Sequence, residues 1–164
     1  MFREMRRRGQ LLPDAEAEAI LASGSTGVLS VLGDGGYPYA VPLNYAYSEG
    51  KLYFHCAKSG HKLDAIRACD KVSFCVVAED CVIPETLSTR YRSVIVFGRA
   101  RILETEEELR RAARAIGEKY GCGSDEVERE IDAELPVLCC VEITPESVTG
   151  KEAKALAQER AKKE

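Results

Sequence analysis

The sequence predicts a mainly β domain, a small antiparallel barrel of six strands with flanking helices. Three observations lead to this fold class. Six runs rich in β-branched and aromatic residues are spread along the 164-residue chain. The first three runs are joined by turns of a few residues, which leaves no room for the crossover helices of a parallel sheet. Helical patterns lie before, between and after the runs, and closure into a barrel would remove exposed sheet edges.

The first half of the chain predicts one helix followed by three strands. The helix is expected over 13–24, with Pro13 in its first turn and Gly24 at its end. The strands are expected over 26–32, 39–47 and 51–57. "GDGGYP" and "SEG" between them carry hairpin-turn residues, so the three strands form a meander. Pro42 lacks an N–H group, which places its position at a sheet edge or a bulge.

The second half alternates helices with three longer strands. These strands are expected over 71–79, 89–103 and 136–143, the middle one bent at Gly98. Helices are expected over 60–69, over 105–121 with a capping box of Thr105 and Glu108, and over "SDEVEREIDAEL". We therefore expect one barrel domain over 1–150 and a charged, helix-prone, solvated tail over 151–164.

Charge and composition narrow the partners and the compartment. The net charge of −4 argues against a general nucleic-acid binder. No window approaches the ~20 apolar residues of a membrane helix, so no membrane partner is expected. The stretch from Met1 to Arg8 carries charge but no apolar segment of a secretory signal, which favours the cytoplasm.

Seven cysteines are present, without the CxxC spacing of zinc or thioredoxin sites. Cys75, Cys139 and Cys140 lie in apolar strand-like runs, where free cysteine usually packs as a small hydrophobic residue. No metal site is expected.

The stretch "LYFHCAKSGHKLDAIR", residues 52–67, changes from a strand pattern to a helix pattern around Ser59, Gly60, His61 and Lys62. A glycine at a helix start lets the backbone approach a ligand, and the first-turn N–H groups carry partial positive charge. Lys62, His61 and the Ser59 hydroxyl would add donors for a phosphate. A solvated turn is the alternative interpretation.

A second feature is "VPLNY", residues 41–45. Asn44 and free backbone groups near Pro42 could border a flat ligand whose phosphate reaches Lys62, on the assumption that this strand pairs with the one leading into "SGHK". An ordinary edge strand with a bulge would explain the same residues, and the residues alone do not decide between the two.

Four motifs together carry a resemblance: "GYPYAVPLNYAY", "GKLYFHCAKSGHKLDAIR", "KVSFCVV" and "TRYRSVIVFGRARIL". In this order and spacing they resemble the FMN-binding split-barrel family related to pyridoxamine 5'-phosphate oxidase, and within it the nitroimidazole-resistance (Nim-type) flavoproteins. The resemblance implies a six-stranded antiparallel Greek-key split barrel. It also implies a homodimer with one FMN in each of two interface clefts.

Carried over by residue, the resemblance implies three groups of cofactor-binding positions. Val41, Pro42, Leu43 and Asn44 would line the isoalloxazine ring. His55 and Cys56 would lie along the ribityl chain, and Gly60, His61 and Lys62 would hold the phosphate. Tyr91, Arg92 and Ser93 would complete the cleft from the partner chain.

The sequence departs from the oxidase itself in ways that argue against pyridoxamine phosphate oxidation. The oxidase has Ser-Arg-Lys where this chain has Gly60, His61 and Lys62, and a lysine in place of Asn44. The chain contains no tryptophan, so the substrate-binding tryptophan of the oxidase has no counterpart.

The expected function is therefore a flavin-dependent oxidoreductase that reduces a small electron-poor compound such as a nitroaromatic. Flavin carries the electron chemistry, so the protein needs only a proton donor, for which His55 and, less readily, His61 are candidates. Two alternatives stay open. One is a flavin carrier, sensor or electron store without a dedicated substrate. The other is haem binding, with His55, His61 or a cysteine as axial ligand. No GxGxxG motif for NAD(P)H is present.

Overall fold

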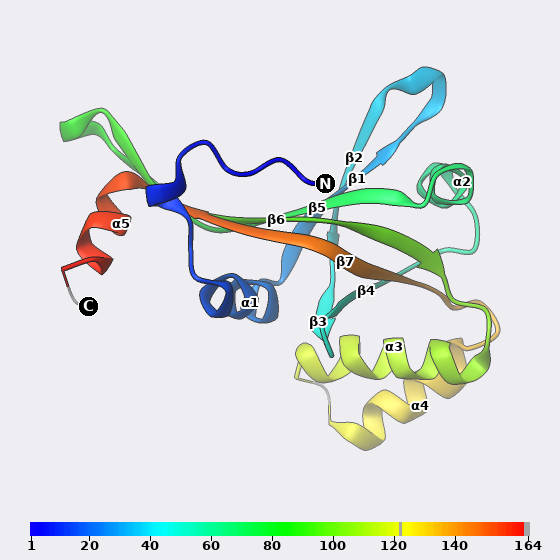
Figure 1. Cartoon of the computed structure of the whole chain (residues 1–164). Coiled ribbons are helices and arrows are strands. Elements are labelled where there is room, and N and C mark those ends of the chain that lie inside the picture. The colour runs from blue at the N-terminus through cyan, green and yellow to red at the C-terminus, as the bar shows by residue number, and fades with distance from the viewer. Residues whose placement is uncertain (122, 163–164) are drawn as a thin grey trace.

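The computed structural model describes residues 1–121 and 123–162, whose strands form one antiparallel sheet (Figure 1). The strand order is β2-β1-β5-β6-β7-β4-β3. The strands are β1 (Thr26–Leu32), β2 (Pro38–Asn44), β3 (Ala46–Ser48), β4 (Lys51–Cys56), β5 (Lys71–Ile83), β6 (Ser88–Ile102) and β7 (Cys139–Glu152). All strand pairings among the described residues are antiparallel, so the mainly β, antiparallel prediction is confirmed.

The sheet has seven strands, so the prediction of six was wrong. The run expected as one strand over 39–47 is interrupted at Tyr45, whose side chain is fully buried. Its hydroxyl donates to the Leu21 carbonyl oxygen at 2.7 Å, and its ring lies edge-on to Phe74. Burying this side chain requires the backbone to turn inward, and that turn ends β2 and begins β3.

This interruption also decides which strands are neighbours. β2 pairs with β1, whereas β3 pairs with β4. β2 and β3 therefore form the opposite edges of the sheet. The expected pairing of "VPLNY" with the strand leading into "SGHK" was therefore wrong. Because Tyr45 alone joins the two edges, the sheet must curl until they approach each other. No pairing between β2 and β3 closes it in the part of the chain that the structure describes.

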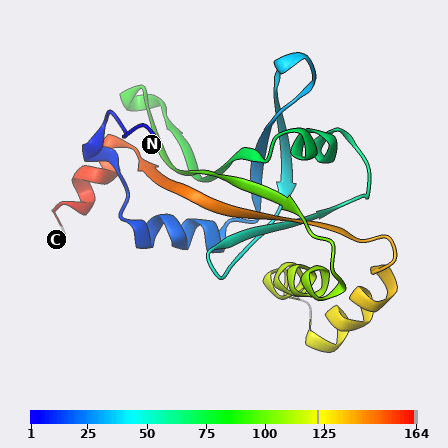
Figure 2. The same cartoon turned by 45° about the vertical axis from the view of Figure 1, so that its right-hand side comes forward.

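The curled sheet encloses the main core. Leu29, Phe74, Val96 and Phe54 are buried there, on four different strands. α1 (Asp14–Ser23) and α2 (His61–Ala68) add buried apolar residues to the same core. Figure 2 shows the β1–β2 hairpin projecting from the body on the side where α2 lies. The edge position expected for Pro42 is confirmed, because β2 is an edge strand.

Three strands carry the longest pairings, and two of them run further than expected. β5 extends to Ile83 and β7 to Glu152, while β6 matches its expected span. The β6–β7 register shifts between Phe97 and Gly98. A Cβ at Gly98 would lie 2.4 Å from the Thr144 carbonyl oxygen, so β7 can approach here only because the residue is glycine.

The other helices lie outside the curled sheet. α3 (Glu106–Lys119) begins with the capping box predicted for Thr105 and Glu108, and α4 (Ser124–Glu134) follows it. Ala112 and Ile116 of α3 cover a second, smaller core cluster on the outer side of β4. These contacts place α3 and α4 beside β4.

The expected solvated tail forms the end of β7 and α5 (Lys154–Arg160). Leu156 and Ala157 are buried, so this segment contributes apolar contacts rather than lying in solvent. The described residues also include three short 3-10 helices: η1 (Arg8–Gln10), η2 (Asp34–Gly36) and η3 (Pro84–Thr86). Within the described residues, no helix has the length and apolar character needed to cross a membrane.

Candidate functional site

The junction between β4 and α2 has the geometry expected of an anion site. α2 begins at His61, and Gly60 precedes it with φ 137° and ψ 162°. Essentially only glycine adopts this conformation, because a Cβ would strain it. The first N–H groups of any helix have no intrahelical acceptor, and the helix dipole adds partial positive charge to them. Ser59 lies exposed one residue before Gly60.

An open hollow of about 670 Å³ lies beside this junction. Its lining residues are His55, Cys56, Ala57, Lys58, Lys62, Glu134, Val137 and Leu138. The structure thus brings together His55, Cys56 and Lys62, three of the expected cofactor-binding residues. Lys58 adds a second cation to the wall, although its ammonium group donates to the Pro136 carbonyl oxygen.

His61 lies on the other side of the α2 start and contacts the β1–β2 hairpin. Its ring is stacked on Tyr39 with centroids 4.2 Å apart and planes at 12°. Its Nε2 atom lies 3.7 Å from a carboxylate oxygen of Asp34. His61 therefore connects the beginning of α2 to β2, the strand that holds the expected ring-binding residues.

Alternate residues of β2 face opposite sides of the sheet. Leu43 packs against the main core, and Val41 is also partly buried. Pro42 and Asn44 are exposed on the opposite side. The Asn44 amide donates to the Ser25 carbonyl oxygen at 3.0 Å, so this side chain also stabilises the end of the β1–β2 ladder.

His55 points away from the core that Cys56 contacts. Side chains alternate along β4, so Cys56 packs on the main core while His55 faces α3 and α4. A second hollow of about 510 Å³ lies there, lined by His55 and by residues of both helices, including Ile116, Val127 and Glu130. His55 is exposed and borders both hollows, which makes it accessible to a small molecule.

Burial controls the ionisation of Cys56. Burial, and to a smaller extent the neighbouring Cys139 thiol, raise the pKa of this thiol to about 11. Lys62 and Arg67 act in the opposite direction and favour the thiolate. The structure therefore places Cys56 within the electrostatic range of the proposed phosphate-binding lysine.

Tyr91, Arg92 and Ser93 do not meet the other expected residues within one chain. They lie on β6 near the β5–β6 hairpin and α5, at the end of the sheet opposite α2 (Figure 1). Contact with the β4–α2 junction would require a second chain.

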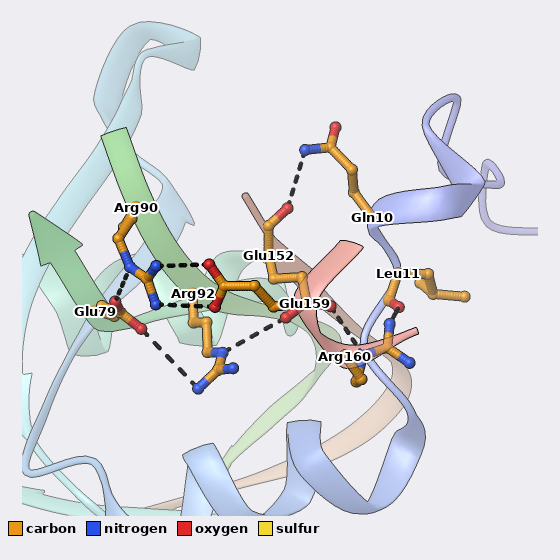
Figure 3. A network of polar contacts seen from close by, with 8 residues as sticks. All are labelled: Gln10, Leu11, Glu79, Arg90, Arg92, Glu152, Glu159 and Arg160. Carbon is orange, nitrogen blue, oxygen red and sulfur yellow. Dashed lines mark hydrogen bonds and ion pairs between the residues drawn. The ribbon is translucent and has the colours of Figure 1, made fainter. Parts of the chain in front are cut away.

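Arg92 belongs to a network of charged side chains at this end (Figure 3). Its Nε atom lies 3.6 Å from Glu152 Oε2, and its Nη1 atom 4.0 Å from Glu79. Glu152 is fully buried and also accepts a hydrogen bond from Arg160 at 2.9 Å. Arg92 Nε and Glu152 Oε2 are both buried without a hydrogen-bond partner. Arg92 is thus held between two carboxylates, with donor capacity remaining.

Sequence reasoning missed Tyr39, Asp34 and Cys139 at the site. Cys139 is the direct cross-strand neighbour of Cys56. No local signal predicts these contacts, because each depends on pairing between distant segments. Among described residues, no group of three or more potential metal ligands is found.

Comparison with known proteins identifies the family of the chain. A family model described as pyridoxamine 5'-phosphate oxidase matches residues 13–152. The chain belongs to this family. The family that the four sequence motifs predicted is thereby confirmed. No curated protein sequence matches the chain significantly.

Several solved structures of similar fold fit this family assignment. A conserved hypothetical protein of Mycobacterium tuberculosis has a TM-score of 0.78 and 24% identity, over 93% of this chain and 92% of its own. A candidate 5-nitroimidazole antibiotic resistance protein of Bacteroides thetaiotaomicron has a TM-score of 0.73 and 20% identity, over 87% and 86%. An FAD-binding protein of Mesorhizobium loti has a TM-score of 0.65 and 28% identity, over 88% and 97%.

Proposed function

We propose that the chain binds FMN between β2 and the β4–α2 junction and acts as an oxidoreductase on a small electron-poor substrate, such as a nitroaromatic compound. The hollow that joins His55, Cys56 and Lys62 at a glycine-led helix start carries this proposal. The family, and the similar FAD-binding protein of Mesorhizobium loti at 28% identity, support a flavin as the ligand.

The phosphate would lie at the beginning of α2. Gly60 leaves the backbone open on this side, since nothing lies within 4 Å of the position that a Cβ would take. Lys62 would supply a full positive charge and the first-turn N–H groups directed donors. His61 is already stacked on Tyr39, so its role would be to hold β2 against this helix start.

The isoalloxazine ring would lie along β2. β2 pairs on one side only, so its other edge offers backbone N–H and C=O groups to the polar edge of a flat ring. Alternate residues of an edge strand direct their backbone groups away from the partner strand, so every second residue among Val41, Pro42, Leu43 and Asn44 would supply these groups, and Pro42 has no N–H to donate.

A second copy of the chain would complete the site. The outer side of the sheet exposes apolar side chains from three adjacent strands: Leu32 on β1, Val77 on β5, and Ile95 and Phe97 on β6. Pro42 is exposed on the same side, because it pairs with Val28, which in turn pairs with Cys75. A homodimer across this surface would cover it and could bring Tyr91, Arg92 and Ser93 of one chain to the flavin of the other.

The dimer can be tested apart from flavin binding. Phe97→Glu would place a charge within the apolar surface, whereas Glu146→Gln removes a charge on the neighbouring strand β7. We expect a dimer mass by light scattering for the wild type and Glu146→Gln, and a monomer mass for Phe97→Glu. A monomeric wild type would contradict the shared cleft.

Bound flavin would supply the electron transfer. The chain's own contribution would be to bind and orient the ring, and to donate a proton from His55, which borders both hollows. Turnover distinguishes this enzyme from a flavin carrier: a nitroimidazole should reoxidise the reduced flavin faster in the wild type than in His55→Gln.

The test of the cofactor site is a titration of the apoprotein with FMN and riboflavin. A charge-assisted contact contributes about 1.5–3 kcal/mol, so Lys62→Ala should weaken FMN binding by about 10- to 150-fold. Riboflavin lacks the phosphate, and its affinity should not change. Lys71→Ala, an exposed lysine on β5, serves as the control. Unchanged FMN affinity in Lys62→Ala would remove this lysine from the site.

A further inference from the structure

Two cysteines from distant parts of the chain lie opposite each other beside the hollow. Cys56 ends β4 and Cys139 begins β7, and the two are direct partners in the antiparallel ladder. Both are free thiols, and both pack on the main core side of the sheet. Opposed residues in such ladders have Cα atoms about 4.5–5.5 Å apart. Disulfides require about 4.4–6.8 Å, so a bridge here needs no large movement of the strands.

The neighbouring cysteine is not the partner of Cys139. Cys140 follows Cys139 on β7, and successive side chains on a strand point to opposite faces. Cys140 accordingly packs in the second cluster with Tyr53 and Ala112. Burial raises the pKa of its thiol to about 12. Cys140 is therefore turned away from Cys56, on the opposite face of the sheet.

The two opposed thiols differ in access. Cys56 is half-buried and lines the open hollow, whereas Cys139 is buried. Lys62 and Arg67 lie close enough to favour a negative charge on the Cys56 sulfur. A small oxidant entering the hollow would reach Cys56 first and find Cys139 directly behind it.

We propose that Cys56 and Cys139 form an oxidisable dithiol, which a hydroperoxide converts into a disulfide between β4 and β7. The Cys56 thiolate attacks one peroxide oxygen, the O–O bond breaks, and the sulfur becomes a sulfenic acid. The hydroxide or alkoxide that leaves takes up the proton that the thiol lost to solvent and becomes water or an alcohol. The Cys139 thiol then attacks that sulfur, the S–S bond forms, and a water molecule leaves. The two thiols give up two electrons when they form the disulfide, and these electrons reduce the hydroperoxide. The reaction does not involve the proposed flavin.

The test uses the reduced full-length protein with hydrogen peroxide. The incubation is mildly alkaline, because burial of Cys56 disfavours its thiolate at neutral pH. Unreacted thiols are then alkylated in denaturant, and peptides are identified by mass spectrometry. The wild type should lose two hydrogens and yield a Cys56–Cys139 cross-linked peptide. In Cys139→Ser the disulfide should be lost, and dimedone should trap a sulfenic acid at Cys56.

Two further variants guard against misreading a folding defect. Cys139→Ala keeps the site apolar and should behave as Cys139→Ser does. Cys75→Ser removes a half-buried thiol from another strand and should leave the cross-link unchanged. The proposal is overturned if the wild type accumulates the same dimedone adduct as Cys139→Ser, if the cross-link joins other cysteines, or if Cys56 stays reduced. Cysteine masses are read without flavin, so failure of flavin binding would not affect this result.

Discussion

The two ends of the curled sheet differ in how far their positively charged side chains are paired with carboxylates. At the α2 end, Lys62 lines an open hollow, and no ion pair joins it to a carboxylate within residues 1–121 and 123–162. At the α5 end, three arginines lie among three glutamates (Figure 3). The residues of this second group are Arg90, Arg92, Arg160, Glu79, Glu152 and Glu159.

The paired charges at the α5 end stabilise the fold, whereas the charge of Lys62 at the α2 end is open to a ligand. Glu152 is fully buried, so its carboxylate needs the adjacent guanidinium groups to offset the cost of desolvation. Gln10 donates to the Glu152 carbonyl oxygen, and Arg160 donates to that of Leu11, which ties the N-terminal segment to β7 and α5. At the α2 end the charge faces a hollow, where an anionic ligand can neutralise it.

Removing the buried carboxylate should have the largest effect. Glu152→Gln keeps the shape of the side chain but leaves Arg92 and Arg160 facing a neutral amide. Breaking a buried ion pair costs about 3–5 kcal/mol, so the free energy of unfolding should fall by about that amount in denaturant titrations. Glu159→Gln, whose carboxylate pairs with Arg90 at the surface, should cost less than about 1 kcal/mol. Equal losses in the two variants would mean that burial does not distinguish these carboxylates.

Much of the fold could be predicted from local sequence, and the exceptions depend on distant contacts. The capping box at Thr105 was correctly placed, and the β6–β7 register shifts at Gly98, where a bend was expected; both signals lie in neighbouring residues. The break at Tyr45 was missed, since "YAVPLNYAY" has unbroken strand propensity and only the contacts with Leu21 and Phe74 bury this ring. Glu152 was assigned to a solvated tail because Arg92 is distant in the sequence and the spacing of Arg160, eight residues away, matches no local pattern.

The candidate site divides in the same way. Gly60 and Lys62 follow from the strand-to-helix change, which is local. The stacking of His61 on Tyr39 and the opposition of Cys56 to Cys139 follow only from how the strands are placed. The sequence therefore predicts the helix start at Gly60 and Lys62, whereas the contacts that His61 and Cys56 make with distant strands could be found only in the structure.

The reactivity of Cys56 shows whether burial or the nearby positive charges have the larger effect on the pKa of its thiol. Burial raises the pKa of this thiol to about 11 from 9.0, despite the opposing effect of Lys62. Alkylation by iodoacetamide, followed at the Cys56 peptide, should thus be roughly 100-fold slower at neutral pH than for an unperturbed thiol. The rate should rise about tenfold per pH unit up to about pH 10. Glutathione serves as the reference thiol. If the alkylation rate of Cys56 levelled off at a lower pH than that of glutathione, the effect of the cations would exceed that of burial.

The smallest expected effect concerns the backbone of the α2 start. Gly60→Ala meets no atom within 4 Å, so its cost comes only from holding alanine at φ 137°. Such strain costs about 1–3 kcal/mol, and relaxing it would change the direction of the first N–H groups of α2. We therefore expect the free energy of unfolding to fall by this amount. The affinity for FMN should also fall more, relative to the wild type, than the affinity for riboflavin. Gly9→Ala, in equally open space without a positive φ, should change neither quantity. If the two alanine variants behave alike, the unusual backbone at Gly60 has no part in phosphate binding, and the contrast between the two ends depends on Lys62 alone.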